Sequence, residues 1–503
     1  MVEKTYDYDD FSRPSEMTTT HGDSEVLTQT DTYVTAYIED VGNVTTGQVH
    51  TRTYAASGYN KTFTYTYDDN GNILSVSDGT YTTSYVYDSA NQLIRENNQA
   101  GGFTHTWTYD SAGNILCREE YDYTTGVLGA PNDTVDYTYG NSSWGDLLTK
   151  YDGRFIGYDD MGNRYSCNGW YYEWQWGRQL ARTLNDDQNW CFFYNTDGMR
   201  MGRTDTYNDT EYTYYYNGSL LRVTTVDGNK LCFVYDAAGT PIQLSYAPAG
   251  STATSYYYFV TNLQGDVIAI LNSSGAVVVE YTYDAWGNIL SITGSMASTL
   301  GVQNPLRYRG YVYDQETGLY YLQSRYYDPE IGRFINADIV YDYDVGLQGF
   351  NLFLYCGNNP VSRIDVSGAD SFDINSARDM LDDLLLEGGS GGNGKGSNWF
   401  KSFTNALRDA SNGLGMATGA KFDTHHVVER CQEWKSGFSH SDIESSDNKI
   451  DLPRSVHRRI SAHYSSIQLY SDGLRVRNWL AGQSFEAQTK YGWTIVYYYL
   501  LEG

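Results

Sequence analysis

The feature that most constrains the fold of this 503-residue chain is a short motif, Tyr-(Asp/Asn)-x-x-Gly, which recurs about every 20 to 25 residues where neighbouring copies are clear. Self-similarity at such a period is typical of repeat architectures, in which each unit buries its apolar face only against its neighbours. The copies lie at Tyr67–Gly71, Tyr109–Gly113, Tyr158–Gly162, Tyr194–Gly198, Tyr235–Gly239 and Tyr283–Gly287, with a variant at Tyr87–Asn91.

One repeat unit shows what each copy is expected to fold into. Residues 62–67, Thr-Phe-Thr-Tyr-Thr-Tyr, alternate threonine with aromatic residues, which is the period of two that favours a strand. Asp69-Asn70-Gly71 supplies the residues that tolerate a hairpin turn, and Ile73-Leu74 begins a return strand. With 50 Tyr and 50 Gly, the chain is predicted to be mainly β. Packing is the preferred interpretation of the aromatic rows, and a carbohydrate-binding surface is the alternative.

The charge is unevenly distributed along the chain. Residues 369–503 contain 14 Lys and Arg against 17 Asp and Glu, so the first 368 residues carry nearly all of the net charge of −28. This balance argues against a molecule that wraps nucleic acid over its whole surface. The six cysteines are scattered without a CxxC pair, which excludes a disulfide framework and a zinc ribbon.

No apolar run reaches the length of a membrane-spanning helix, and the N-terminus lacks the apolar stretch of a signal peptide. The repeat pattern is already present at Tyr8-Asp9-Asp10. The chain is therefore expected to begin in the middle of a longer repeat array.

Residues 304–368, here called the signature segment, carry a more specific string of motifs. It begins Asn-Pro-Leu-Arg-Tyr-Arg-Gly-Tyr, continues through Arg-Tyr-Tyr-Asp-Pro and Gly-Arg-Phe, and closes with Asn-Asn-Pro-Val. The string resembles the Rhs core-associated domain, and the repeats resemble the YD repeats of Rhs proteins, of the C subunits of insecticidal toxin complexes, and of teneurins. This resemblance implies a spiral β-hairpin shell over residues 1–303, closed by the signature segment and followed by a variable C-terminal toxin.

The resemblance also implies self-cleavage just after the signature segment, by paired carboxylates acting as an aspartic protease. Two acids held close together share a proton, and this splits their pKa values. The candidates by position are Asp338 and Asp365, with Asp328 in reserve. The sequence departs from the family motif Asp-Pro-x-Gly-Leu, because residues 365–369 read Asp-Val-Ser-Gly-Ala. The alternative interpretation is that these aspartates only form turns.

The composition changes after the signature segment. Residues 374–387 have the apolar spacing of a helix, and the glycine-rich run 388–394 is typical of a flexible linker. We therefore expect a helix and linker over residues 369–397, and a folded domain over 398–503. Five of the eight histidines fall between His425 and His463. Imidazole serves both as a base near neutral pH and as a metal ligand, so this cluster is the best chemical clue in the chain.

The pattern His425-His426, then Asn448, then Leu-Pro and a helical His457 resembles the AHH branch of the HNH (His-Me finger) nucleases. That family is a small α+β fold that holds one divalent metal ion, Mg²⁺ or Zn²⁺ or another transition metal, between a β hairpin and a helix. The resemblance implies the following roles. His426 is the general base and Asn448 fixes its loop; His425, His457 and His463 are metal ligands; Arg454, Arg458 and Arg459 hold the nucleic-acid backbone.

This sequence departs from the nuclease pattern in two places. Family members often carry a second helical histidine four residues after the first, but that position here is Ser461. His463 stands six residues after His457 and equally fits a histidine buried in the core. Adjacent residues on a strand point to opposite faces, so His425 and His426 face one metal only if the strand twists locally. His440 has no counterpart in the pattern and is interpreted as a surface residue.

Together the motifs predict a polymorphic toxin of interbacterial competition, whose shell encloses a metal-dependent endonuclease with DNA as the favoured substrate. The family implies that the producer exports it, that it acts in the cytoplasm of the target cell, and that its partners are nucleic acid, a cognate immunity protein, and the rest of the shell or an export apparatus. Two alternatives remain open: a non-enzymatic adhesion protein with a degenerate tail, and a different chemistry, such as an RNase, in the same tail.

Overall fold

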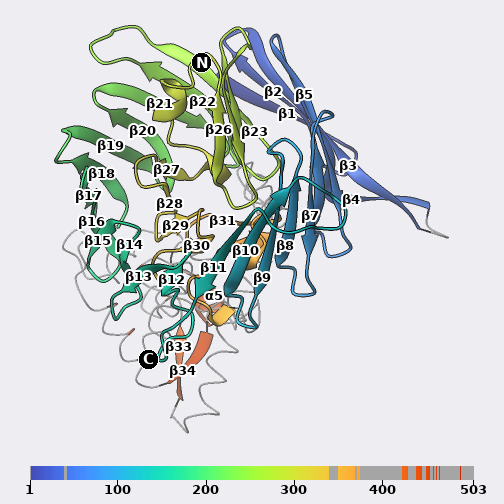
Figure 1. Cartoon of the computed structure of the whole chain (residues 1–503). Coiled ribbons are helices and arrows are strands. Elements are labelled where there is room, and N and C mark those ends of the chain that lie inside the picture. Colours follow the sequence, from blue (N-terminus) through green and yellow to red (C-terminus); the bar gives the residue numbers. More distant parts are fainter. Residues whose placement is uncertain are drawn as a thin grey trace. The chain divides into compact units, whose positions relative to one another are not determined.

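The computed structural model describes residues 2–38, 42–196, 198–338, 349–368, 371–373, 422–426, 438–444 and 449–453, and single residues at 428, 435, 457, 460, 464 and 488. The chain divides into two compact units, Met1–Leu386 and Glu387–Gly503. The first unit is built almost entirely of strands (Figure 1), so the prediction of a mainly β chain is confirmed. No helix among these residues is both long enough and apolar enough to cross a membrane.

A single sheet of 26 strands forms the wall of the first unit, and each strand pairs antiparallel with the next one in the chain. The first strands are β1 (Val2–Tyr8), β2 (Pro14–His21), β3 (Ser24–Ile38), β4 (Gly42–Ala56), β5 (Tyr59–Tyr67), β6 (Ile73–Ser77), β7 (Thr82–Tyr87), β8 (Leu93–Asn98) and β9 (Phe103–Tyr109). The next are β10 (Ile115–Asp122), β11 (Asp133–Thr138), β12 (Lys150–Tyr151), β13 (Arg154–Tyr158), β14 (Arg164–Cys167), β15 (Trp170–Gln175), β16 (Gln179–Leu184), β17 (Asn189–Tyr194) and β18 (Arg200–Asp205). The last are β19 (Thr210–Asn217), β20 (Leu220–Val226), β21 (Asn229–Tyr235), β22 (Pro241–Ala247), β23 (Ser255–Thr261), β24 (Val267–Asn272), β25 (Val277–Tyr283) and β26 (Ile289–Thr293).

The aspartate of the repeated motif closes a turn between two strands, and the copy at Asp68 is representative. Its Oδ1 accepts hydrogen bonds from the backbone N–H groups of Asn70 (2.9 Å) and Asn72 (2.8 Å), and its Oδ2 accepts one from Asn72 Nδ2 (2.8 Å). Gly71 has φ of 86°, a left-handed conformation that side chains with a Cβ rarely adopt. The motif therefore encodes a turn with both carboxylate oxygens satisfied.

In six of the seven motif copies the tyrosine fastens the turn to the preceding strand. Tyr67 Oη donates to the carbonyl of Val49 on β4 at 2.7 Å. Burial raises the pKa of the Tyr87 hydroxyl, which therefore stays protonated and able to donate. The same bond recurs from Tyr87 to Ile73, Tyr109 to Leu93, Tyr194 to Leu180, Tyr235 to Leu221 and Tyr283 to Val267.

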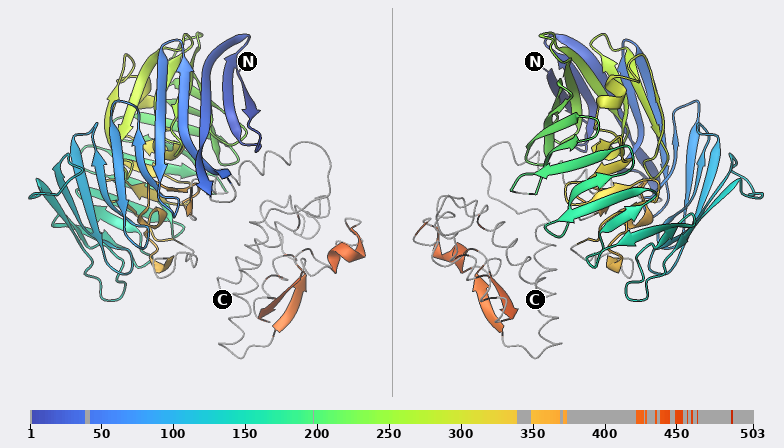
Figure 2. Two further views of the ribbon diagram at one scale, coloured as in Figure 1. Left: turned by 90° about the vertical axis from the view of Figure 1, so that its right-hand side faces the viewer. Right: turned by 60° about the vertical axis from the view of Figure 1, so that its left-hand side comes forward.

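The wall winds round so that its first strands meet its last ones (Figures 1 and 2). The N–H of Gly58, between β4 and β5, donates to the carbonyl of Gly275, between β24 and β25, at 3.1 Å. A Cβ on Gly58 would lie 2.9 Å from the Cα of Ala276, so this approach requires glycine. Lys4 Nζ pairs with Asp236 at 2.8 Å. These contacts close the wall without a continuous ladder of backbone hydrogen bonds.

The described part of the signature segment lies between opposite walls of the sheet (Figure 1), and its buried tyrosines belong to the same clusters as those of the wall. Tyr320, Tyr327 and Tyr355 are fully buried. Helix α1 (Leu300–Gln303) precedes the segment and β32 (Ser371–Asp373) follows it. The described elements of the segment are short: η1 (Tyr308–Gly310), β27 (Val312–Asp314), β28 (Leu319–Tyr321), β29 (Tyr326–Asp328), β30 (Arg333–Phe334), η3 (Cys356–Asn358) and β31 (Arg363–Asp365).

Three asparagines of the signature segment bond the buried amide side chains that end successive wall turns. Buried polar groups need such partners, because an unmade hydrogen bond costs about 1–3 kcal/mol. The bonds run from the Nδ2 of Asn351 to Asn114 (2.8 Å), of Asn358 to Gln92 (2.9 Å) and of Asn359 to Asn72 (2.7 Å).

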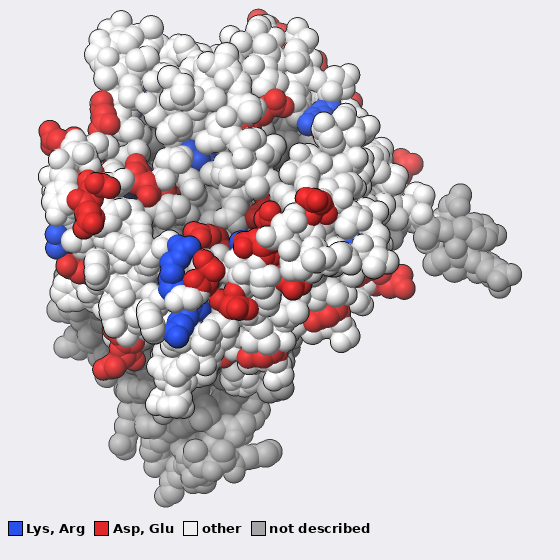
Figure 3. Space-filling model, in the orientation of Figure 1, with Lys and Arg blue, Asp and Glu red and all other residues white. Residues whose placement is uncertain are grey.

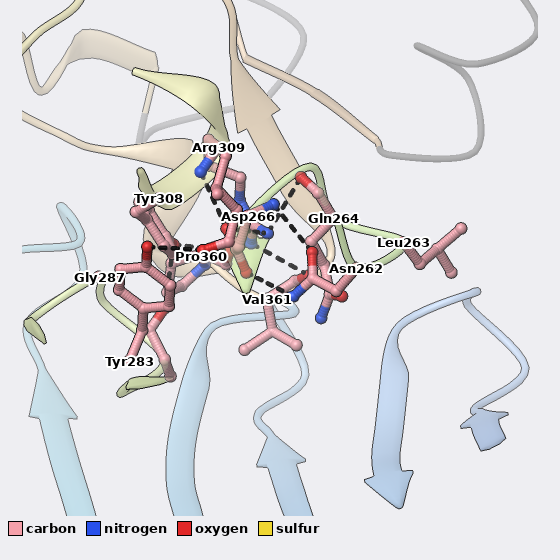
Figure 4. A network of polar contacts seen from close by, with 12 residues as sticks. Asn262, Leu263, Gln264, Asp266, Tyr283, Gly287, Tyr308, Arg309, Pro360 and Val361 are labelled. Atoms are coloured by element: carbon pink, nitrogen blue, oxygen red, sulfur yellow. Dashed lines mark hydrogen bonds and ion pairs between the residues drawn. The ribbon is translucent and has the colours of Figure 1, made fainter. Parts of the chain in front are cut away.

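Buried ion pairs add to this attachment. Arg200 bonds both oxygens of Asp314, at 2.5 and 2.8 Å. Arg309, with φ of 54°, bonds Asp266 on the wall and the carbonyl of Pro360 (Figure 4). The start and the end of the signature segment are thereby held at one place on the wall.

In the second unit, the described strands are β33 (Phe422–His426) and β34 (Lys449–Pro453), which pair antiparallel, and the described helix is α5 (His440–Ile443). Ile450 and Leu452 on β34 are buried. His457, Ile460 and Tyr464 each have α-helical conformation, and Ile460 and Tyr464 are buried.

Candidate functional site

Two groups of side chains have the composition of a reactive site, one in each unit. In the first, Asp338 and Asp365 both face the guanidinium of Arg325. Arg325 Nη2 lies 2.7 Å from Asp338 Oδ2 and 3.4 Å from Asp365 Oδ2. The three side chains are almost fully buried. The guanidinium is positioned by Phe334, whose ring centroid lies 3.4 Å from it. The fold thus brings together the two aspartates favoured by the sequence.

Asp365 differs electrostatically from an ordinary surface carboxylate. Burial raises its pKa to about 6, although Arg325 and the N–H groups of Ser367 and Gly368 favour the charged form. Its Oδ1 accepts from Ser367 N at 3.2 Å and from Gly368 N at 2.7 Å. A carboxyl with this pKa both takes up and releases a proton near neutral pH. The pair therefore has the chemistry of an acid and base next to a peptide bond.

Asp328, the reserve candidate, lies elsewhere. Its carboxylate pairs with Arg164 on β14 at 2.8 Å, and its Oδ1 accepts from the backbone N–H groups of Glu330 and Ile331. These contacts hold a turn and attach it to the wall. Asp328 thus fits the structural alternative that the sequence left open for all three aspartates.

The second group lies in the β33–β34 hairpin. His426 pairs in register with Lys449, and its Nε2 lies 3.4 Å from Glu444 Oε1 at the end of α5. Lys449 Nζ lies 2.6 Å from Glu444 Oε2. The hydrogen bond from Lys449 lowers the pKa of Glu444 to about 2, and the bond from His426 acts in the same direction. An ionised carboxylate beside an imidazole fixes the ring and favours its role as a base.

The structure describes only some of the other predicted site residues. His457 has helical conformation and is half-buried, and His425 pairs in register with Ile450. His440 begins α5 and is exposed, as expected of a surface residue. The described residues contain no group of three or more His, Cys, Asp or Glu that could hold a metal ion. The candidates Asn448, Arg454, Arg458, Arg459 and His463, and the side chain of His425, lie outside the described residues.

Sequence reasoning missed three members of these groups. Arg325 stands inside the Arg-Tyr-Tyr-Asp-Pro string, but nothing in that string shows that its partners are Asp338 and Asp365. Glu444 and Lys449 stand in an ordinary polar run. The signal that could have found Lys449 is the antiparallel register, which places it opposite His426 once the hairpin is assumed.

The comparisons with known proteins agree with the fold. Residues 245–361 match the family model described as "Teneurin YD-shell". The crystal structure of TcdB2-TccC3-Cdc42 superposes with a TM-score of 0.53 at 20% identity, over 76% of this chain and 21% of that one. The wall, its turns and the enclosed segment have the fold of a YD-repeat β shell, and the stretch that includes β23–β26 and most of the signature segment is similar to the shell of teneurins.

Two curated relatives share more sequence. The chain is 37% identical over 230 residues to the tRNA3(Ser)-specific nuclease WapA of Bacillus spizizenii, and 35% identical over 232 residues to the tRNA nuclease WapA of Bacillus subtilis. Each alignment covers 44% of this chain and 9% of the relative, so the chain spans less than a tenth of the length of these relatives.

Proposed function

We propose that the chain is part of a polymorphic toxin of interbacterial competition, in which the β shell encloses a C-terminal metal-dependent endonuclease. Support comes from the shell fold, from relatives named as nucleases, and from the tail itself. The observation that carries the nuclease proposal is the β33–β34 hairpin bearing His426, followed by His457 in helical conformation. This order matches the strand–strand–helix arrangement of the His-Me finger nucleases.

In this proposal His426 takes a proton from the attacking water, and Glu444 orients its ring. Asn448 fixes the loop that presents the base, and His425, His457 and His463 hold the metal. A donor set of imidazoles suits Zn²⁺ or another transition metal better than Mg²⁺, which prefers oxygen ligands. When bound, the metal would stabilise negative charge on the scissile phosphate and on the leaving oxygen. Arg454, Arg458 and Arg459 would hold the backbone without reading its sequence.

The substrate is nucleic acid, with two candidates. The resemblance of the tail to HNH nucleases favours DNA as the substrate. RNA is favoured by a separate observation, because both WapA relatives are named as tRNA nucleases. Acidic side chains are spread over the shell face in Figure 3, around a smaller group of basic ones, whereas the charges of residues 369–503 nearly balance, so the tail repels a polyanion less than the shell does. The remaining alternative is an adhesion protein whose tail has no activity.

The proposal includes release of the tail by self-cleavage at the end of the signature segment, with the buried carboxyl pair Asp338 and Asp365 as the acid–base group. The buried pair on Arg325 supports this step. The producing cell would export the protein and protect itself with an immunity protein that binds the tail, and the released tail would act in the cytoplasm of the target cell.

A digestion assay tests the nuclease. The full chain and residues 369–503 are incubated with total tRNA and with plasmid DNA, in Zn²⁺, Mg²⁺ or EDTA. We expect metal-dependent cleavage that falls about 100-fold or more in His426→Ala, because general-base catalysis contributes about that much. The matched control is His440→Ala, which changes an exposed histidine. Folded wild-type protein that cuts neither substrate in any metal would leave only the adhesion alternative.

A further inference from the structure

The peptide bond between Ser367 and Gly368 is held on its carbonyl side by hydrogen bonds from a distant turn. The carbonyl oxygen of Ser367 accepts two hydrogen bonds, both from Ser324 in the turn between β28 and β29. The Ser324 hydroxyl donates at 2.8 Å, and the Ser324 N–H, which also donates to the Leu322 carbonyl at 2.8 Å, donates at 3.1 Å. Two donors aimed at one carbonyl oxygen polarise it and stabilise the negative charge that appears there when the carbonyl carbon is attacked.

The nitrogen side of the same peptide bond faces the carboxyl pair. Gly368 N–H donates to Asp365 Oδ1 at 2.7 Å, and the Gly368 carbonyl accepts from Arg325 Nε. Gly368 has φ of 78°, and a Cβ there would lie 2.7 Å from the Leu322 carbonyl oxygen and 2.8 Å from Ser324 Oγ. Only glycine fits, so the peptide is fixed in one orientation between Ser324 and Asp365.

Water reaches this peptide from one side only. Asp365 and Gly368 are buried, whereas Ser324 is exposed and Val366 has 52% of its surface exposed. The Ser367 carbonyl therefore lies at the boundary between the solvent and the buried carboxyl pair. This is the position that a hydrolysed carbonyl must occupy, because it needs both a water molecule and an acid–base group.

We propose that Ser367–Gly368 is the bond cut in self-cleavage, and that Ser324 stabilises the oxyanion formed on the Ser367 carbonyl. The inference rests on the self-cleavage proposed above and adds to it the scissile bond and a further catalytic residue. Residues 365–369 lack the Pro and the Leu of the motif Asp-Pro-x-Gly-Leu, so the scissile bond is inferred here from the bonding of Ser367 and Gly368 and not from the motif.

The step is a hydrolysis with water as the co-reactant. The water oxygen bonds to the carbonyl carbon of Ser367, and Asp365 takes the proton that the water loses. The electron pair of the carbonyl moves to its oxygen, where Ser324 donates. The C–N bond then breaks, the pair returns to the carbonyl, and Asp365 passes its proton to the nitrogen of Gly368. The products are a Ser367 carboxyl group and a new amino terminus at Gly368. Asp338 keeps Arg325 in place beside Asp365.

Intact-mass spectrometry of the purified full chain, with sequencing of the new amino terminus, tests the proposal. We expect a fragment that begins at Gly368. Ser324→Ala removes the hydroxyl donor and should slow its appearance about 100-fold, the usual effect of losing one oxyanion donor. Ser324→Thr keeps a hydroxyl and should retain most of the rate. The matched control is Gln323→Ala, which changes the neighbouring side chain and should leave the rate unchanged. Thermal unfolding of each variant checks that the wall still folds.

The possible failures are distinguishable. A cut at Gly368–Ala369 or further on, or a Ser324→Ala rate equal to that of the wild type, would overturn the inference and leave self-cleavage standing. A wild-type chain that never cuts itself would overturn self-cleavage and this inference together, while the nuclease assay would be unaffected.

Discussion

The wall turn at Asp68 and the last turn of the signature segment at Asp365 use the same residue in nearly the same local motif. In both, Oδ1 accepts two backbone N–H groups just ahead in the chain. They differ in what Oδ2 meets. In the wall turn it accepts from Asn72, whereas at Asp365 it faces Arg325, beside Asp338. In the wall turn the carboxylate is a structural clamp, whereas burial raises the pKa of Asp365 to about 6, so this carboxyl can exchange a proton near neutral pH.

The two turns therefore differ in their surroundings and not in the aspartate or its local bonds. Asp365 is buried beside Asp338 and Arg325, which the fold brings from other parts of the chain. Asp328 also lies in the signature segment, but its carboxylate pairs with Arg164 and its Oδ1 holds a turn through the N–H groups of Glu330 and Ile331.

Exchanging the carboxyl groups for amides should give the largest difference between the two turns. Asp365→Asn should reduce self-cleavage more than about 100-fold, because an amide neither accepts nor returns the proton, and Asp338→Asn should reduce it less, because Asp338 acts only by holding Arg325. Asp68→Asn should leave the cleavage rate within a factor of two. The measurement is the half-time of fragment formation on a gel. A cleavage rate in Asp365→Asn close to that of the wild type would make the two turns chemically equivalent.

The attachment of the signature segment to the wall turns should be visible in stability. Asn359→Ala removes the buried bond to Asn72 and leaves that amide without its partner, which should cost about 1–3 kcal/mol in the free energy of unfolding. Urea unfolding followed by tryptophan fluorescence measures the change. The control Ser274→Ala changes an exposed turn residue and should cost less than about 0.5 kcal/mol. Equal effects would mean that the asparagine bonds are not an anchor.

The pH dependence sharpens the comparison further. The pKa of Asp365 is raised from 3.8 to about 6, so the base form is lost as the pH falls below 6. The rate of self-cleavage should fall roughly tenfold per pH unit between pH 6 and 4. Folding stability should change in the opposite direction. The folded state binds the proton more tightly, so acidification from pH 6 towards 3.8 adds stability at this residue. Asp365→Asn should remove that component of the stability profile, and a rate that stays flat between pH 5 and 7 would exclude Asp365 as the base.

The smallest expected effect concerns the motif tyrosines. Tyr67→Phe deletes one hydroxyl bond to the Val49 carbonyl and should lower the stability of the wall by about 1 kcal/mol. It should not change self-cleavage. Thermal unfolding at neutral pH measures the first effect, and an unchanged melting temperature would show that the solvent replaces this bond.

The part of the fold that could be predicted from the sequence is the local part. The hairpins around Tyr67–Gly71 and its copies follow from alternation and turn chemistry, because a strand and its return lie within about twenty residues. The closure of the wall at Gly58 and Gly275 could not be predicted, since no local pattern connects residues so far apart.

In the candidate sites, too, the local part could be predicted from the sequence and the long-range contacts could not. Asp338 and Asp365 could be selected by their place in a recognisable string, but their shared partner Arg325 depends on the path of the signature segment inside the wall. In the tail, histidine clustering pointed to His426, and Glu444 became visible only through the paired hairpin. The roles of Asn448, Arg454 and His463 remain predictions.

The bonds from the signature segment to the wall turns also determine the order in which the first unit matures during synthesis. Asn359 bonds Asn72, which leaves the ribosome 287 residues earlier. The Asn72 amide oxygen therefore lacks its buried partner until the signature segment has been made, and such long-range contacts make folding slow. Sealing of the wall is thus a late event, timed by the last part of the first unit to be translated.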